Sequence, residues 1–578
     1  MKTKSWWMDC LWLSLGIAIL FGFMLGCRAL SVPDEARYTE IPREMLLFHD
    51  FITPHLDGIK YFEKPPLLYW IQSGAIALWG INEWALRLPT ALIALLGCLF
   101  TYLAGRSLFD RVTGLISAVI LATSPLYFAM AHSITLDMTV SVWLSLTLFA
   151  FIVAVDLPVD SVLRRNVCWV MYIAAALAVM TKGLIGIVLP GMVIFSWLLI
   201  FNRWRELKRI NLVSGLLIFL LISVPWHILV QIKNPEFFHF YFVDQHFTRY
   251  FTKAMGRYKP FWWFVPILFG GLFPWIMFLP QAIRNVTLNA WLQRKQPMLQ
   301  RKIFLLLWAL EIFLFFSWSD SKLIPYIVPV FPPLAVLIGG YMGVVILEGL
   351  AVIPAKAGIQ LEIDSSLRWN DNADSSLRWN DNSISFILIS IIAVLFALAA
   401  GSIGFWHHGF SIGAIHHLYV VAMILIVMAV GVWCFSKLKQ KIYWLLVLQI
   451  LFLWSLVATI PYFDQRPIKP LALLINQYAK PNDVVASYGL YYQDLPVYTQ
   501  RLVLIVDWKN ELEFGSQHQA NANHYLIDQQ QFWKIWQSPQ HVFAVMDKDD
   551  YQHLQSKYKL YLVAQHAQDY LVSNQSEK

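Results

Sequence analysis

The chain has 578 residues, of which 58% are apolar and only 14% charged, and its formal net charge is +8. Apolar runs of about 18 or more residues recur along most of it, each long enough to cross a hydrocarbon core of roughly 30 Å. This composition excludes an ordinary water-soluble chain and predicts a polytopic membrane protein.

The first apolar run, from about Trp6 to Cys27, follows Lys2 and Lys4. It spans about 20 residues and no small-residue cleavage site ends it, so we interpret it as a retained span and not as a signal peptide. Further runs of the same kind follow along the chain. The thirteen predicted spans are 6–27, 84–105, 112–131, 138–156, 167–181, 184–201, 212–231, 261–282, 303–318, 323–347, 384–404, 415–435 and 442–461.

The loops between these spans carry a directional charge pattern. If thirteen spans alternate, the basic clusters at 106–111, 164–165, 203–209, 284–302 and 437–441 all fall on one side. Lysine and arginine mark the cytoplasmic side, so we expect the N-terminus inside and the C-terminal segment outside. The positive charge is therefore explained by topology, because a nucleic-acid binder gathers its basic residues in one folded patch. No nucleic-acid partner is expected.

Two domains are expected, a membrane domain over 1–461 and an outside domain over 462–578. Within the first outside segment, 28–83, the stretches Ile41–Phe51 and Leu67–Leu78 are typical of amphipathic helices at the membrane interface. The last domain alternates apolar strand-like and helical runs, which predicts a small α/β fold. The expected strands are Val484–Ser487, Leu502–Val506, His541–Val545 and Leu560–Ala564, and the expected helices are Lys469–Ala479 and Gln530–Trp536.

The stretch 350–383 does not follow this plan. Asp364–Asn372 recurs as Asp374–Asn382, a tandem repeat too short for a solenoid. We interpret 350–383 as a repeat-element insert in a cytoplasmic loop, without a function of its own. Such an insert is tolerated because lengthening a loop costs little.

The first outside segment also carries the densest polar chemistry. Asp34, Arg37 and Tyr38 are spaced to share one helix face. The structural alternative is a helix start with favourable acids in its first turn. Glu63 and Lys64 precede two prolines that fix the local backbone. The alternative for Lys64 is a lysine that extends to the lipid headgroups.

Further charged residues lie in the other outside segments. Arg249 and Lys322 are candidate cations for a phosphate leaving group, which needs positive charge as it departs. Lys182 lies near another outside turn, and Asp137 begins a span where a carboxylate is costly. The alternative for each cation is an ordinary anchor at the membrane edge. No histidine or cysteine spacing predicts a metal site.

The motifs resemble a known family at this point. Pro33–Tyr38 with Glu40–Met45, followed by Tyr61–Pro65, resembles the first outside loop of the bacterial 4-amino-4-deoxy-L-arabinose transferases of lipid A. These are polyprenyl-phosphate-dependent, C-type glycosyltransferases and relatives of the protein O-mannosyltransferases. Ser321–Tyr326 is similar to a later family motif, and Tyr491–Tyr498 with Glu511–Gly515 is similar to the family's C-terminal domain. The resemblance covers most of the chain except about 350–383.

The resemblance implies roles for individual residues. Asp34 corresponds to the family's essential first-loop aspartate, and Lys64 to the lysine that holds the lipid phosphate. Tyr61, Glu63 and Arg37 are expected in the same cavity, with Arg249 as a second phosphate ligand. The expected catalytic residues are Asp34, Glu63 and Lys64. Lys322 and Tyr326 of the later motif complete the expected substrate-binding set, together with Asp137, which its costly position at membrane depth suggests. The implied fold is a bundle of about thirteen spans with a periplasmic α/β domain. A divalent metal is associated with such enzymes, and no ligand set in the sequence demands one.

We therefore expect an inner-membrane glycosyltransferase that moves a sugar from undecaprenyl phosphate to lipid A, which would weaken binding of cationic antimicrobial peptides. Its partners would be the polyprenyl-linked donor, lipid A or another envelope acceptor, and membrane lipids. One alternative is a relative that acts on a lipopolysaccharide core sugar or a protein hydroxyl, because fold does not fix the acceptor. Another is a lipid flippase or transporter, which would concentrate paired charges at the membrane midplane.

Overall fold

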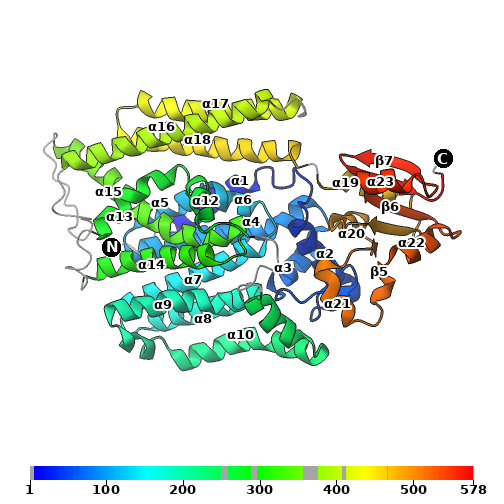
Figure 1. Ribbon diagram of the computed structural model, residues 1–578. Helices are drawn as coiled ribbons and strands as arrows, with labels where there is room; N and C mark the ends of the chain where they lie inside the picture. The colour runs from blue at the N-terminus through cyan, green and yellow to red at the C-terminus, as the bar shows by residue number, and fades with distance from the viewer. Residues whose placement is uncertain are drawn as a thin grey trace. The chain divides into compact units, whose positions relative to one another are not determined.

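The computed structural model describes residues 6–248, 258–287, 296–355, 375–406, 412–464 and 466–576, and Figure 1 shows its elements in chain order. The chain forms two compact units. The membrane unit comprises Met1–Met24, Thr90–Pro225 and Phe247–Ile460. The loop unit comprises Leu25–Pro89, Trp226–His246 and Pro461–Lys578.

Each predicted span coincides with a helix or with a bent pair of helices. The helices are α1 (Trp6–Gly22), α4 (Glu83–Leu108), α5 (Arg111–Ala122) with α6 (Pro125–Ala131), α7 (Leu136–Asp156), α8 (Val162–Lys182), α9 (Ile185–Phe201), α10 (Leu212–Lys233), α12 (Phe264–Gly271) with α13 (Leu279–Thr287), α14 (Pro297–Trp318), α15 (Phe331–Ala355), α16 (Ser375–Trp406), α17 (Ile412–Cys434) and α18 (Leu438–Thr459). Short helical turns lie at η1 (Trp204–Lys208), η3 (Phe261–Trp263), η4 (Trp275–Phe278), η5 (Ile324–Val330) and η7 (Ile460–Tyr462).

The number of membrane crossings follows from helix length and composition. Among the described residues, 8 helices are long and apolar enough to cross a membrane, or up to 10 if each bent pair is one span. Helices α1 and α9 are apolar but only 17 residues long. The chain is thus a multi-pass membrane protein, as predicted, while the count of thirteen stays a prediction.

Two of the expected spans are broken. Helices α5 and α6 meet at 67°, where Pro125 begins α6 without a backbone N–H to continue the ladder of α5. The segments Phe261–Gly271 and Trp275–Arg284 meet at 100°, and Gly270, Gly271 and Pro274 lie at or beside that break. The sequence predicts each of these segments as one continuous span, because hydropathy depends on composition and not on the direction of the helix axis.

The predicted insert lies largely beyond this description. Residues 356–374, which contain the first repeat copy, are outside the described residues. The backbone of α16 begins at Ser375, inside the second copy. The interpretation of 350–383 as an insert therefore stays a prediction.

The first part of the loop unit contains α2 (Asp34–Phe48), β1 (His55–Leu56), β2 (Ile59–Lys60) and α3 (Leu67–Trp79), and η2 (His239–Thr248) begins within the unit's second segment. Helix α2 starts after Pro33, with Asp34 and Glu35 in its first turn, where acids are favourable. It ends at His49, whose φ of 52° leaves the helical region. Both helices predicted in this segment are present.

The C-terminal part of the loop unit is a six-stranded sheet with helices. Its strand order is β5-β4-β3-β6-β8-β7. Strands β5, β4, β3 and β6 are parallel to one another, and β8 is antiparallel to both β6 and β7. The strands are β3 (Val484–Tyr488), β4 (Leu504–Val506), β5 (Leu526–Ile527), β6 (Val542–Asp547), β7 (Tyr561–His566) and β8 (Asp569–Ser573). The helices and turns are α19 (Lys469–Tyr478), α20 (Asp494–Thr499), η8 (Asn510–Leu512), α21 (Glu513–Gln517), η9 (Ala522–His524), α22 (Gln529–Trp536) and α23 (Lys548–Leu554).

Side chains of successive strand residues point to opposite faces, so the sheet has two cores. On one face, Ala486 and Ala544 pack with Phe532 and Trp536 of α22. The other core combines three groups: the sheet residues Val485, Ile505, Phe543, Val545 and Leu571; Ile468, Leu471 and Ile475 of α19 and the residue before it; and the first-segment residues Ile41, Met45, Leu56, Ile59, Tyr61 and Tyr69. The first outside segment therefore completes the core of the C-terminal sheet.

Candidate active site

Helix α2 presents a carboxylate and a guanidinium from its first turns. Asp34 is half exposed, at 51%, while the Arg37 side chain is 8% exposed. The shortest distance between the two charged groups is 3.8 Å, from Arg37 Nη1 to Asp34 Oδ1. The predicted spacing thus places both residues on one helix face, with the cation buried behind the exposed acid.

The buried Arg37 guanidinium has a second acidic partner from the C-terminal part of the loop unit. Its Nη2 lies 2.7 Å from Glu511 Oε2, and the Gln493 side-chain amide donates to the same carboxylate. Burial raises the pKa of Glu511 to about 7, although Arg37 acts in the opposite direction. The Arg37 Nε atom is buried and has no hydrogen-bond partner among the described residues. Arg37 therefore retains one donor for a further acceptor.

Residues 61–64 bring more charge to this place. Tyr61 is almost fully buried. Burial raises the pKa of its hydroxyl, the Arg37 charge lowers it, and the charges of Glu63 and Glu511 raise it further. These mutual effects show that the four groups lie within electrostatic reach of one another. The neighbouring Lys64 Nζ donates to the Glu63 carbonyl oxygen at 2.8 Å. Asp34, Arg37, Tyr61 and Glu63 are therefore brought together, with Lys64 adjacent.

A second group of predicted site residues lies in the membrane unit. Asp137, in the first turn of α7, forms an ion pair with Lys182 at the end of α8. The Lys182 Nζ lies 4.5 Å from the centre of the Tyr326 ring in η5. The ends of α7 and α8 and the turn η5 thus meet around one lysine. The sequence predicts Lys182 only as a cation near a turn. No sequence pattern predicts its pairing with Asp137, because the two residues are far apart in the chain.

Two further predicted residues are Lys322 and Arg249. The Lys322 Nζ donates to the carbonyl oxygens of Lys259, at 2.9 Å, and of Ser319. Its side chain is buried, and burial lowers its pKa. In this structure Lys322 thus bonds to backbone oxygens. Arg249, the predicted second phosphate ligand, lies outside the described residues.

Glu511, Gln493 and Tyr69 are not among the site residues that the sequence predicts. Glu511 and Gln493 are far from the first outside segment in the chain, so no local pattern links them to Arg37. Tyr69, in α3, is fully buried, and its hydroxyl has no partner among the described residues. Only the resemblance in the C-terminal motif pointed to the region of Glu511.

Comparisons with known proteins find relatives over large parts of the chain. Residues 63–228 match the family of dolichyl-phosphate-mannose-protein mannosyltransferases, and 471–574 match the aminoarabinose transferase C-terminal domain. The undecaprenyl phosphate-alpha-4-amino-4-deoxy-L-arabinose arabinosyl transferase of Erwinia tasmaniensis is 34% identical over 330 residues, which cover 56% of this chain and 58% of that protein. The protein of the same name from Pseudomonas aeruginosa is 33% identical over 329 residues, with 56% and 58% covered. The match thus spans less than two thirds of each relative.

The structural likeness extends further than these sequence matches. The crystal structure of ArnT from Cupriavidus metallidurans bound to undecaprenyl phosphate has a TM-score of 0.83 and 27% sequence identity, with 99% of both chains covered. An oligosaccharyltransferase of Archaeoglobus fulgidus has a TM-score of 0.50 at 13% identity, which shows a shared fold only. The predicted fold class, a helical membrane protein with a C-terminal domain of this kind, is confirmed.

Proposed function

We infer that the chain is a membrane glycosyltransferase of the aminoarabinose transferase family, and we propose that it moves 4-amino-4-deoxy-L-arabinose from undecaprenyl phosphate to lipid A. The observation that carries the proposal is the likeness over 99% of the chain to a protein crystallised with undecaprenyl phosphate. The relatives' names supply the sugar. The acidic and basic side chains gathered around Arg37 supply chemistry of the required kind.

The donor reaction breaks the bond between the sugar's anomeric carbon and the phosphate oxygen. The oxygen keeps the electron pair, so the departing polyprenyl phosphate gains negative charge. Buried, pre-placed cations stabilise such charge more strongly than water does. Arg37, Lys64 and Arg249 are assigned this role. Support comes from Arg37, whose buried Nε has no partner within the described structure.

The role of Asp34 depends on the acceptor. A lipid A phosphate is already an anion at neutral pH, so its oxygen attacks the anomeric carbon without losing a proton. Asp34 would then orient the substrate. A hydroxyl acceptor would need a general base, and the half-exposed Asp34 carboxylate would take that proton. Asp137, Tyr326 and Lys322 remain assigned to substrate binding.

Carboxyl groups near Arg37 suit an amino sugar. Those of Asp34, Glu63 and Glu511 lie within electrostatic reach of Arg37. The amine of 4-amino-4-deoxy-L-arabinose is protonated at neutral pH, and a carboxylate accepts strong hydrogen bonds from such a group. A neutral sugar has no charge to offer them.

The proposal also fixes a location. The enzyme would lie in the bacterial inner membrane, with a cytoplasmic N-terminus and a periplasmic domain at 462–578. The loops with the most lysine and arginine would then face the cytoplasm, as the membrane charge rule requires. The acids and bases of the first outside segment, 28–83, would face the leaflet in which the donor's phosphate lies.

The test is a transfer assay in membranes that contain the protein at matched expression. Undecaprenyl-phosphate aminoarabinose and lipid A are supplied, and mass spectrometry of lipid A is the readout. We expect one aminosugar added by the wild type and at least about a 100-fold lower rate for Asp34→Asn and for Lys64→Ala, since both alter charge at the reacting groups.

Matched controls remove the same kinds of charge elsewhere in the loop unit. Asp549→Asn and Lys534→Ala change exposed residues of α23 and α22, and both should keep the wild-type rate. If folded wild-type protein adds no sugar, this donor and acceptor pair is rejected. If the wild type is active and both site variants keep its rate, the assigned site is wrong while the reaction stands.

A further inference from the structure

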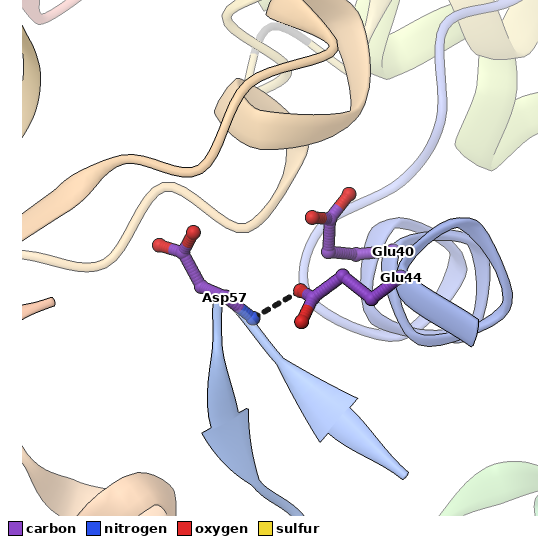
Figure 2. Close-up of side chains that lie close together, drawn as sticks. All are labelled: Glu40, Glu44 and Asp57. Atoms are coloured by element: carbon purple, nitrogen blue, oxygen red, sulfur yellow. Dashed lines mark hydrogen bonds between the residues drawn. The ribbon is translucent and has the colours of Figure 1, made fainter. Parts of the chain in front are cut away.

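Three carboxyl groups meet in the interior of the loop unit, and none of them belongs to the group around Arg37. Glu40 and Glu44 lie on α2, and Asp57 lies in the turn between β1 and β2 (Figure 2). All three side chains are fully buried. One carboxyl oxygen from each lies within 4.8 Å of the others. We call these three residues the carboxyl cluster.

The local sequence explains why the three groups meet. Glu40 and Glu44 are four residues apart on a helix, which puts them on one face. Asp57 and Gly58 have φ angles of 53° and 76°, as expected for an Asp-Gly turn in a two-residue hairpin. The Glu44 carboxylate accepts the backbone N–H groups of both turn residues, that of Gly58 at 2.8 Å. Helix and hairpin are thereby fixed to each other.

The carboxyl cluster carries up to three negative charges, and one arginine contacts it. Arg43 binds Glu40 through two contacts, at 2.7 Å and 2.5 Å. The neighbouring groups from other elements are the phenols of Tyr491 and Tyr525, which supply no cation. Burial, together with the Glu40 charge, raises the pKa of both Glu44 and Asp57 well above the usual range. Two further positive charges, as protons or as a cation, would balance the group.

Two buried oxygens at this place are left without partners. Asp57 Oδ1 accepts the Val503 N–H at 2.9 Å, whereas Asp57 Oδ2 has no hydrogen-bond partner within the described structure. The Tyr491 hydroxyl has none either, and this side chain is only 8% exposed. The charges that act on that hydroxyl are led by Asp57, Glu40 and Glu44. A second polar group, from the C-terminal part of the loop unit, thus lies within electrostatic reach of the carboxyl cluster and has an unused oxygen.

We propose that Glu40, Glu44 and Asp57 bind one divalent cation that prefers oxygen ligands, such as Mg²⁺, Mn²⁺ or Ca²⁺. The donors are carboxylates, with a phenol nearby and no sulfur or imidazole, which favours these ions over Zn²⁺. An ion with ligands at about 2.1–2.6 Å holds donor oxygens that are up to about 5 Å apart, in agreement with the observed spacing. One such ion would supply both missing charges.

The cation would have a structural role. It would join α2 to the hairpin, and through the bond from Val503 it would join both to the C-terminal sheet. Helix α2 carries Asp34 and Arg37 in its first turns, and β2 leads directly to Tyr61 and Glu63. The site is separate from the proposed transfer chemistry, so its test does not use sugar transfer as a readout.

The first experiment counts bound ions in the full-length protein in detergent. After prolonged treatment with a chelator and its removal, Mn²⁺ is titrated and free Mn²⁺ is measured by electron paramagnetic resonance. We expect the wild type and Asp549→Asn to bind about one Mn²⁺ more per chain than Asp57→Asn, since the amide lacks the charge that holds the ion. Asp57→Asn keeps an oxygen that can accept the Val503 N–H.

The second experiment separates the cation from protons. Without metal, the melting temperature should fall from about pH 5.5 to about pH 8.5, because acids with raised pKa values lose protons that the folded state needs. Saturating Mn²⁺ or Ca²⁺ should raise it by several degrees at the higher pH and little at the lower, since protons compete with metals for carboxylates. Asp57→Asn should show no such cation effect.

The outcomes decide whether protons or a bound divalent cation neutralise the carboxyl cluster. If wild-type protein binds no Mn²⁺ at either pH and its melting temperature ignores the cation, protons alone hold the carboxyl cluster and the proposal is overturned. Equal Mn²⁺ binding by folded Asp57→Asn overturns it as well. If Asp57→Asn does not fold, Glu44→Gln takes its place, and anomalous scattering from Mn²⁺-soaked wild-type crystals locates the ion directly.

Discussion

Asp34 and Glu35 are adjacent in the sequence but have opposite environments. Asp34 is half exposed, whereas Glu35 is buried against two arginines. The Glu35 carboxylate accepts hydrogen bonds from Arg28 at 2.6 Å and from Arg87 at 2.9 and 2.8 Å. Burial alone would raise its pKa, but Arg87 and Arg28 lower it to about 2. Glu35 is therefore a structural group beside Asp34, the carboxylate proposed to act on the substrate.

We predict that Glu35→Gln lowers the free energy of unfolding by about 3–5 kcal/mol at pH 7, because it leaves two arginines buried without their counter-charge. The folded-state pKa lies below the unfolded value. The wild type therefore keeps this stability above about pH 4.5 and loses it as the pH falls towards about 2. Thermal unfolding across this pH range should show that the difference in stability between wild type and Glu35→Gln decreases as the pH falls.

The control is Glu513→Gln, which changes an exposed acid at the start of α21 and should alter stability by no more than about 0.5 kcal/mol. A Glu35→Gln protein as stable as this control at pH 7 would contradict the assigned role of the two arginines.

At this scale the sequence predicts contacts within an element and misses those between distant ones. The helical spacing of Asp34 and Arg37 is readable, because a turn of helix fixes it. The partner of Arg37 is not readable, because Glu511 reaches it only after the C-terminal sheet has packed on the first segment. The carboxyl cluster was missed for a similar reason. Its acids come from a helix and a turn, so they form no ligand-spacing motif.

At the scale of elements, the hairpin turn is a point of close contact between the first segment and the C-terminal part of the loop unit. Gly58 has a φ of 76°, and a Cβ there would lie 2.6 Å from the Tyr525 ring. Any side chain at this position meets both a strained backbone and an aromatic ring. The turn is thus restricted to glycine by two independent causes.

We predict that Gly58→Ala destabilises the protein by about 2 kcal/mol or more, the sum of an unfavourable φ and overpacking. Gly74→Ala is the matched control. Gly74 lies in α3 with open space around its Cβ position, so alanine there should be neutral or stabilising by up to about 1 kcal/mol. Melting temperatures of the two variants in one detergent compare them. Equal melting temperatures would contradict the prediction, because they would show that the Tyr525 ring and the turn backbone shift at little energetic cost.

Secondary structure was predictable where the pattern was long or strongly periodic. The four expected strands and two expected helices of the C-terminal part are all present. Strand β5 was not predicted because it has only two residues, Leu526 and Ile527, which is too short for an alternating pattern. Strand β8 was not predicted either, although it pairs with both β6 and β7. The bends at Pro125 and Pro274 were missed because both flanks are equally apolar.

At the scale of the whole molecule, the loop unit is built from three segments that are far apart in the chain. The C-terminal segment pairs with the first one through Lys469 with Glu83, Tyr498 with the Leu30 N–H, and Arg37 with Glu511. The two segments also share one apolar core. These contacts make the first segment dependent on residues after 460.

We therefore predict that a chain ending after Ile460 inserts in the membrane but loses the structure of its first outside segment. Four buried apolar side chains would become exposed to water, those of Ile41, Met45, Leu56 and Ile59. Burying one side chain of this size stabilises the folded state by about 1.5–3 kcal/mol. Trypsin should cleave the truncated protein rapidly after Arg43 or Lys60, where the intact chain resists. Sugar transfer should fall below about 1% of the wild-type rate, because the pairing of Arg37 with Glu511 is gone.

Deleting one copy of the repeat, 364–373, is the control, since shortening a long loop changes its closure entropy by less than about 1 kcal/mol. That protein should keep both trypsin resistance and activity. If the truncated chain instead resists trypsin at these two sites as the intact chain does, the first segment folds without the C-terminal sheet. The shared core would then be a contact between two independently stable parts, and the dependence inferred from it would be wrong.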